Sequence, residues 1–273
     1  MTFPLTWLYV PGDRPHVVAK ALRCGADVVV IDLEDAVAPD RKEYAREATA
    51  ELLSEEQPVP VHVRVNALDG PLAVPDLRAV AALPGVHGLR LPKVTSPAQI
   101  TRIADHLAEH GPRPLYALLE TALGVEHAYA IAAAHPDLRG ISLGESDLRA
   151  DLGVRADAGL DWSRSRVIVA ARAAGLAPPP QSVHPDIRDL EGLASSCAHG
   201  RGLGFLGRSA IHPRQLPIIE RAYLPTQREI EEAETIVKAA AAEPGAQALP
   251  DGRFVDAAVV ATARRTLSLA RRT

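Results

Sequence analysis

The chain has 273 residues, a net charge of -4 and 47% hydrophobic residues, which is enough apolar material for a substantial core. Only 4% of its residues are aromatic and no basic stripe is present, so we expect no nucleic-acid partner. No apolar run reaches the roughly 18 residues of a membrane helix, and the N-terminus lacks the features of a signal peptide. Two cysteines, Cys24 and Cys197, cannot form a disulfide framework, and we expect a cytoplasmic protein with no membrane partner.

Short β-branched runs alternate with longer amphipathic stretches along the chain. We predict strands at 7–10, 26–31, 59–65, 86–91, 115–119, 140–143, 181–183 and 205–211. We predict helices at 15–24, 41–55, 97–109, 124–134, 162–174, 187–200 and 213–222. Eight strands with intervening helices favour a parallel sheet, and eight is the number that closes a TIM (β/α)8 barrel. The seventh predicted strand has the shortest apolar run, and three prolines precede it.

The predicted barrel covers residues 1–223 and leaves a C-terminal helical extension at 224–273. Residues 227–242 are strongly amphipathic, and a final helix is predicted at about 257–271. A segment of about 50 residues is too short to bury a second core alone. We therefore expect the extension to pack on the barrel or on a neighbouring subunit.

Ionisable residues follow seven of the eight predicted strands. In chain order they are Asp13 and Arg14, then Asp32, Glu34 and Asp35, then Arg64, Lys93, Glu120, Asp147 and His212. In a TIM barrel the chemistry lies at the carboxyl ends of the strands. A solvated rim would also be polar, but charges that directly follow apolar runs are partly buried. Buried charges persist only when they are paired or bind a metal.

Glu120 and Asp147 follow neighbouring predicted strands, so their carboxylates could converge on one ion. Oxygen ligands without cysteines or clustered histidines suit Mg²⁺, whose remaining positions water and substrate would fill. The alternative is a structural role for both carboxylates.

Arg14 and Arg64 lie near the same predicted rim, where a guanidinium could bind a substrate carboxylate with two hydrogen bonds. Alternatively, both arginines pair with the carboxylates that follow the second predicted strand. His212 ends a predicted strand in I-H-P, and the roles of a catalytic base and of a loop-organising residue fit it equally.

Residues 28–35 read V-V-V-I-D-L-E-D, a buried strand that runs into three carboxylates. We predict that Asp32, Glu34 and Asp35 orient Arg14, Arg64 and Lys93, and that they do not hold the metal themselves.

A set of motifs in order extends over nearly the whole chain. They are P-G-D-R-P (11–15), D-L-E-D-A-V (32–37), R-V-N (64–66), L-P-K (91–93), L-L-E-T (118–121), D-L-R-A-D-L-G (147–153), A-I-H-P-R-Q (210–215) and F-V-D (254–256). With these motifs the chain resembles the citrate lyase β-subunit-like proteins of the HpcH/HpaI aldolase superfamily. The resemblance implies a TIM barrel that assembles into homotrimers or hexamers. It also implies Mg²⁺ held by Glu120 and Asp147, with Arg14 and Arg64 clamping the carboxylate and reacting oxygens of a small oxo- or hydroxy-acid.

The implied reaction is reversible carbon–carbon cleavage of a malyl-, citramalyl- or citryl-type thioester into an oxo-acid and an acetyl thioester. The thioester carrier would be coenzyme A or an acyl carrier protein. The resemblance makes Asp256, contributed by a neighbouring subunit, the acid–base group, although the sequence alone predicts a helix cap there. Arg64 would neutralise developing negative charge. Three alternatives are an aldolase acting on free oxo-acids, a thioesterase with malate-synthase-like chemistry, and a non-catalytic carrier-binding subunit.

Two positions depart from the family pattern. The family commonly has G-x-E-D, whereas this chain has Gly144-Glu145-Ser146-Asp147, which displaces the acidic neighbour of Asp147 by one residue. Relatives also often have proline two residues after the C-terminal aspartate, and this chain has V-D-A-A.

Overall fold

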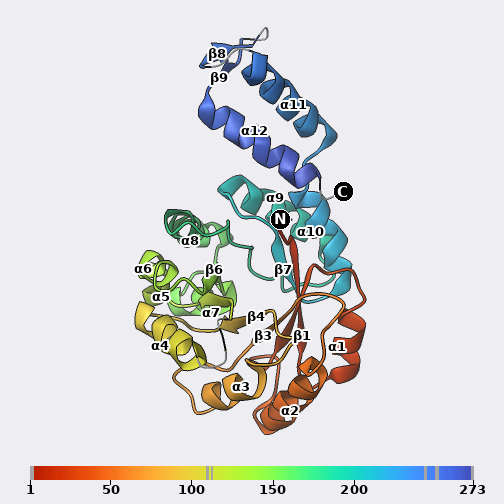
Figure 1. Ribbon diagram of the computed structural model, residues 1–273, viewed down its shortest axis with the longest axis vertical. Coiled ribbons are helices and arrows are strands. Elements are labelled where there is room, and N and C mark those ends of the chain that lie inside the picture. Colours follow the sequence, from red (N-terminus) through yellow and green to blue (C-terminus); the bar gives the residue numbers. More distant parts are fainter. Residues whose placement is uncertain (1–2, 109–110, 112, 243–244, 250–251, 272–273) are drawn as a thin grey trace. The chain divides into compact units, whose positions relative to one another are not determined.

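A computed structural model describes residues 3–108, 111, 113–242, 245–249 and 252–271. Its main element is a parallel sheet of seven strands in the order β6-β5-β4-β3-β2-β1-β7 (Figure 1). The strands are β1 (Thr6–Pro11), β2 (Val28–Asp32), β3 (Val61–Arg64), β4 (Gly88–Leu91), β5 (Leu115–Leu119), β6 (Leu138–Leu143) and β7 (Arg208–Ala210). Each lies within a predicted strand or extends it by no more than two residues.

Helices form a layer outside these strands (Figure 1). They are α1 (Pro15–Ala21), α2 (Lys42–Leu53), α3 (Ala73–Val80), α4 (Pro97–Leu107), α5 (Ala122–Glu126), α6 (Ala128–Ala132), α7 (Glu145–Leu152), α8 (Asp161–Ala173), α9 (Leu190–Leu203) and α10 (Leu216–Tyr223). The helix predicted at 124–134 is two short helices that meet at His127. Residue 109, the predicted end of the 97–109 helix, lies outside the described residues.

Side chains at alternate strand positions face the concave side of the sheet, as a period of two requires. There the Tyr116 ring of β5 stacks on the His62 ring of β3, with 4.5 Å between centroids. A Cβ on Gly88 would lie 2.8 Å from the Tyr116 ring, so glycine at this position makes room for both rings. Arg90 of β4 donates a hydrogen bond to the hydroxyl of Tyr9 on β1. Because these two strands are three apart in the sheet, the sheet must curve strongly.

The seventh predicted strand, 181–183, is reduced to a single parallel bridge between Gln181 and Arg208. Gln181 donates its backbone N–H to Gly207 O and accepts one from Ser209 N. The sheet of the described residues therefore has seven strands, and the fold it shows is a strongly curved parallel α/β sheet. Closure into an eight-stranded TIM barrel stays a prediction. The three prolines before Gln181 cannot donate to a ladder, which accounts for the short pairing.

The chain divides into two compact units, Leu5–Glu220 and a second unit that contains the chain from Arg221 onward. In the second unit α11 (Gln227–Ala242) packs against α12 (Ala257–Ala270), and the two-residue strands β8 (Gln247–Ala248) and β9 (Phe254–Val255) pair antiparallel. Both predicted C-terminal helices are confirmed. The packing of this extension on the barrel or on another subunit stays a prediction.

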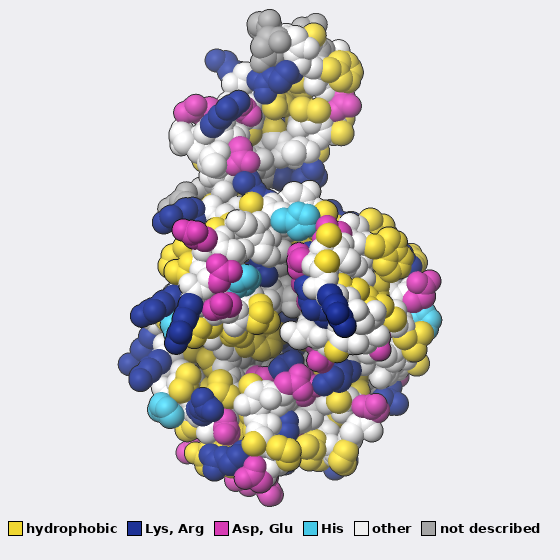
Figure 2. Space-filling model, turned by 180° about the vertical axis from the view of Figure 1, so that it is seen from behind, with side chains coloured by type: hydrophobic (Ala, Val, Ile, Leu, Met, Phe, Trp, Pro, Cys, Tyr) yellow, Lys and Arg dark blue, Asp and Glu magenta, His cyan; other side chains and the backbone are white. Residues whose placement is uncertain are grey.

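Acidic and basic side chains are interspersed on the face shown in Figure 2. Within the described part of the chain, no helix is long and apolar enough to cross a membrane.

Candidate functional site

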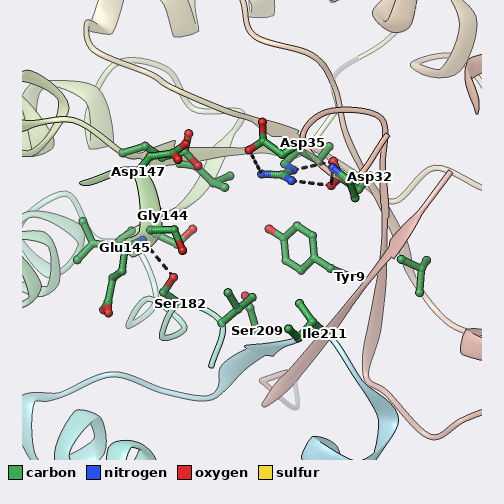
Figure 3. Close-up of a pocket in the computed structure, with 18 of the residues that line it drawn as sticks. Tyr9, Asp32, Asp35, Gly144, Glu145, Asp147, Ser182, Ser209 and Ile211 are labelled. Atoms are coloured by element: carbon green, nitrogen blue, oxygen red, sulfur yellow. Dashed lines mark hydrogen bonds and ion pairs between the residues drawn. The ribbon is translucent and has the colours of Figure 1, made fainter. Parts of the chain in front are cut away.

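A cavity of about 470 Å³ opens at the carboxyl ends of the strands (Figure 3). Five residues predicted for the site line it, namely Asp32, Asp35, Arg64, Glu120 and Asp147. Figure 3 shows Asp32 and Asp35 on one side of the cavity, and Gly144 and Glu145 on the other. The structure thus brings residues that end or follow four separate strands to a single cavity.

Arg64, the last residue of β3, is held by three carboxylates at the carboxyl end of β2. Its Nε and Nη2 donate to the two oxygens of Asp32 at 2.7 and 2.6 Å, and its Nη1 lies 2.9 Å from Glu34 Oε2. Asp35 is 3.6 Å away. Burial disfavours the charged guanidinium, but the hydrogen bonds to Asp32 and the nearby carboxylates outweigh it and raise the pKa of Arg64. Arg64 is therefore a fixed cation with most of its donors already engaged.

Asp32 also shapes the turn that follows β2. Its Oδ1 accepts from Glu34 N at 2.9 Å and its Oδ2 accepts from Ala36 N at 3.1 Å. Lys42 of α2 donates to the carbonyl oxygens of Leu33 and Glu34 at 2.8 and 2.6 Å. These contacts fix the carboxylates of V-V-V-I-D-L-E-D in place as partners of Arg64.

Lys93, which follows β4, contacts the carboxylates after β2 through its side chain and Glu120 through its backbone. Its Nζ donates to Glu34 Oε1 at 2.5 Å, and it lies 3.4 Å from Asp35 and 3.8 Å from Asp147. Burial opposes the ammonium, but the hydrogen bond and charge of Glu34, with Asp35 and Glu120, raise the pKa of Lys93. Its backbone has φ 53°, a left-handed conformation that non-glycine residues adopt rarely and that accompanies functional sites.

Glu120 lies at the cavity wall with only 2% of its surface exposed. Its Oε2 accepts a hydrogen bond from the backbone N–H of Lys93 at 3.1 Å. Burial, followed by the charges of Glu34 and Asp147, raises the pKa of Glu120 to about 8, against the opposing effect of Arg64 and Lys93. A Cβ on Gly144 would lie 2.4 Å from Glu120 Oε1, so the absent side chain of Gly144 provides the space for this carboxylate.

Asp147 lies in the first turn of α7, and its side chain is 46% exposed at the cavity. Its neighbour Glu145 faces Arg164 instead, whose Nε and Nη2 donate to the Glu145 oxygens at 2.9 and 2.7 Å. Asp147 is therefore the α7 carboxylate that remains available to a ligand. Its charge contributes to the raised pKa of Glu120, which places the two carboxylates within electrostatic reach.

The two carboxylates suit a hard cation. In the described part of the chain no group of three or more His, Cys, Asp and Glu side chains could hold a metal ion. Two carboxylates on a cavity wall nevertheless match Mg²⁺, which commonly keeps several waters and takes one or two protein carboxylates. The oxygen-only donor set fits such an ion, and the absent side chain of Gly144 lets the Glu120 carboxylate take its place at the cavity wall.

Three predicted site residues lie elsewhere. Arg14 is exposed at the start of α1, outside the residues that line the cavity. Asp256 belongs to the C-terminal unit, where its Oδ1 accepts from Ala258 N and Val259 N and caps α12. His212 accepts from Arg214 N at 3.1 Å and caps a short 3-10 helix, so the contact it makes is the loop-organising one.

Several lining residues were not predicted. They are Tyr9, Ser142, Ser182 and Ser209, together with Glu145. Tyr9, Ser142 and Ser209 lie two residues before Pro11, Gly144 and Ile211, which also line the cavity. The alternation of side chains along a strand could have found these three, since residues two apart share a face.

The sequence matches the model of the HpcH/HpaI aldolase/citrate lyase family over residues 5–213. The chain belongs to this family. Family membership agrees with the site geometry, in which carboxylates and Arg64 line one cavity at the strand ends.

Relatives within the HpcH/HpaI family cover nearly the full chain. A Cereibacter sphaeroides protein named (3S)-malyl-CoA thioesterase is 36% identical, with 96% of this chain and 93% of the relative covered. A Mycobacterium tuberculosis citrate lyase subunit beta-like protein is 37% identical over the same shares. The crystal structure of CitE from M. tuberculosis with magnesium, acetoacetate and coenzyme A has a TM-score of 0.82 and 36% identity, and covers 98% of both chains.

Proposed function

We propose that this family member is a Mg²⁺-dependent carbon–carbon lyase. It cleaves a malyl-, citramalyl- or citryl-type 3-hydroxyacyl thioester into an oxo-acid and an acetyl thioester. The observation that carries the proposal is the convergence of Glu120, Asp147 and Arg64 on one cavity. The similar M. tuberculosis structure, which contains magnesium, acetoacetate and coenzyme A, supports the same class of ligands here.

Glu120 and Asp147 would hold the Mg²⁺, with the remaining positions left to water and substrate oxygens. When bound, the ion supplies a Lewis acid that polarises the reacting oxygen of the substrate. Lys93 orients Glu120 through its backbone N–H, and its ammonium offsets part of the negative charge of Glu34 and Asp35.

Arg64 would neutralise the negative charge that develops during cleavage, because Asp32 and Glu34 hold its guanidinium rigidly at the cavity. In the reaction, the 3-hydroxyl group loses its proton and the carbon–carbon bond breaks as the oxo group forms. The electron pair passes to the enolate of the acetyl thioester, which takes up a proton at carbon. Asp256 of a neighbouring subunit is the proposed acid–base group, and Arg14 the proposed second carboxylate clamp.

The proposal extends to the assembly and the carrier. The proposed fold is a complete (β/α)8 barrel, and the proposed assembly is a homotrimer or hexamer. In such an assembly the C-terminal unit of one subunit would reach the cavity of another. Coenzyme A is the proposed carrier because it is present in the similar structure, with an acyl carrier protein thioester as the other carrier.

The test is to incubate the protein and Mg²⁺ with a panel of 3-hydroxyacyl-CoA esters. We expect release of an oxo-acid in equal amount with an acyl-CoA that keeps its thioester bond, and loss of activity with EDTA. Production of free coenzyme A thiol without oxo-acid would contradict the lyase assignment.

A second candidate is a thioesterase, which the name of the C. sphaeroides relative favours. A thioesterase would release coenzyme A thiol together with the intact hydroxy-acid, for example malate. Measuring free thiol and oxo-acid in the same reaction separates the two activities.

A further inference from the structure

A buried arginine lies within the curved sheet, below the cavity. Arg90 of β4 is 2% exposed, and its guanidinium carbon lies 5.6 to 6.0 Å from the ring centroids of Trp7, Tyr9 and Tyr116. Among the described residues no carboxylate forms an ion pair with Arg90. Burial and the charge of Arg90 hold the pKa of nearby His62 well below its usual value, so His62 adds no charge. The positive charge of Arg90 is thus stabilised by aromatic rings and by one hydrogen bond.

That hydrogen bond determines the role of the Tyr9 hydroxyl. Arg90 Nη1 lies 3.3 Å from the hydroxyl oxygen of Tyr9. A guanidinium can only donate, so the phenol oxygen accepts and Tyr9 keeps its own proton for another acceptor. Tyr9 lines the cavity, and Figure 3 shows its ring directed into it. The described protein residues offer the Tyr9 hydroxyl no second hydrogen-bond partner.

Two other cations at or near the cavity, Arg64 and Lys93, are less available to an anion. Arg64 is engaged by Asp32 and Glu34, and Lys93 by Glu34. The outer part of the cavity carries Asp35 and Asp147. Their negative charges repel the carboxylate of a ligand unless a cation is bound between them. The base of the cavity, where the hydroxyl of Tyr9 lies next to the unpaired charge of Arg90, favours an anionic oxygen.

We propose that Tyr9 binds the oxo-acid part of the substrate through its hydroxyl, and that Arg90 is the positioning residue that aims this hydroxyl into the cavity. This inference rests on the proposed function for the identity of the ligand. The Tyr9 O–H donates to an anionic carboxylate oxygen of the bound 2-oxo-acid. Arg90 acts through Tyr9 and does not touch the ligand.

The test measures binding and not turnover. Pyruvate and oxaloacetate are titrated by calorimetry into the Mg²⁺-loaded protein. Tyr9→Phe should raise the dissociation constant about tenfold or more, because a hydrogen bond to a charged group is lost while the ring that contacts Arg64 remains. Tyr116→Phe is the matched control, since Tyr116, like Tyr9, contacts the Arg90 guanidinium but does not line the cavity. The dissociation constant of this variant for pyruvate and oxaloacetate should equal that of the wild type. Equal affinities for Tyr9→Phe and wild type would overturn the inference.

A double-mutant cycle tests the role of Arg90. Arg90→Met should weaken pyruvate binding in the wild-type background and have little further effect in the Tyr9→Phe background. Equal effects in both backgrounds would show that Arg90 acts without Tyr9 and would overturn its positioning role. Should Arg90→Met fail to fold, Arg90→Gln completes the same cycle.

The same titrations distinguish this inference from the proposed function. A wild-type protein that binds 2-oxo-acids through Tyr9, yet cleaves no hydroxyacyl thioester, would support the inference and refute the lyase. A wild-type protein that binds neither 2-oxo-acid would refute the inference, while the panel of 3-hydroxyacyl-CoA esters would still decide on the lyase.

Discussion

The backbone N–H of Lys93 lies 3.1 Å from Oε2 of Glu120, and Lys93 makes this contact with φ 53°. One residue thus supplies a donor to the buried carboxylate through its backbone and pairs with Glu34 through its side chain. A left-handed conformation costs a residue with a Cβ about 1–2 kcal/mol. The fold therefore maintains a local strain at the point where β4 meets the candidate metal site.

This strain predicts that Lys93→Gly is more stable than Lys93→Ala, the reverse of the usual order for glycine and alanine. Lys93→Gly and Lys93→Ala both remove the ammonium, but only glycine adopts φ 53° freely. We expect the free energy of unfolding of Lys93→Gly to exceed that of Lys93→Ala by about 1 kcal/mol. Urea denaturation of both variants measures the difference. A more stable alanine variant would show that position 93 carries no backbone strain.

Removal of either candidate metal ligand should abolish Mg²⁺-dependent activity. We expect Glu120→Gln and Asp147→Asn to lower kcat/KM more than about 100-fold, because each loses a charged oxygen ligand. Glu126→Gln changes an exposed glutamate of α5 and serves as the control. Steady-state kinetics at several Mg²⁺ concentrations gives the result, and full activity of Glu120→Gln at saturating Mg²⁺ would refute the assignment.

The space beside Glu120 predicts a specific effect of a single methyl group. In Gly144→Ala the new Cβ would fall 2.4 Å from Glu120 Oε1, so the carboxylate must move. A displacement of about 1 Å at a catalytic group can lower activity about 100-fold. Gly202→Ala, where no neighbouring heavy atom lies within 4 Å of the added Cβ, should leave activity unchanged and is a control for kinetics alone, because alanine in α9 raises stability slightly. Comparison of kcat/KM and apparent Mg²⁺ affinity between the two alanine variants makes the measurement.

The two roles of Asp256 can be separated by substitution. Asn caps a helix as well as Asp does, but it cannot transfer a proton. If Asp256 is the acid–base group, Asp256→Asn should lose more than about 100-fold in kcat while α12 keeps its stability. Asp256→Ala should lose activity and also reduce the free energy of unfolding by about 1 kcal/mol, because it removes the cap. Wild-type kcat in Asp256→Asn would leave Asp256 with the structural role alone.

The Arg164 network predicts an acid-dependent loss of stability. Hydrogen bonds from Arg164 lower the pKa of Asp157 from 3.8 to about 2. A carboxyl group whose folded pKa is depressed stabilises the fold above its unfolded pKa and loses that contribution as the pH falls toward the folded value. Asp157→Asn should therefore reduce the free energy of unfolding at pH 7 by no more than about 1 kcal/mol, since this side chain is 62% exposed. Urea titrations should show that the difference narrows between pH 4 and pH 2.

The sequence predicted strands such as β2 and β5 because their apolar runs are nearly unbroken and are buried in the sheet. It missed α3, whose segment contains prolines at 71 and 75, and α7, whose polar residues resemble a loop. Asp147 therefore lies on a helix and not at a strand end. The partners of Arg64 could be predicted because they follow from the carboxyl ends of consecutive strands, which lie side by side in a parallel sheet.

Other features of the site depend on contacts distant in sequence. The hydrogen bond between Tyr9 and Arg90 joins residues 81 positions apart, and Arg164 reaches Glu145 from a different helix. A local pattern holds no information on such pairs. Arg14 follows the end of β1 as its motif predicted, but its exposed side chain lies outside the residues that line the cavity, and its role as a clamp stays a prediction.

Ser182 accepts a hydrogen bond from the backbone N–H of Glu145, and this contact joins the segment after the Gln181 bridge to the start of α7. The cavity wall there includes Ser182 and Val183, which lie outside the named strands. The side chain of Val183 can change in size without disturbing a strand ladder or the hydrogen bond between Ser182 and Glu145. Divergence among family members with different acyl substrates is therefore expected to concentrate in this segment, where new specificities can evolve at little expense to the fold.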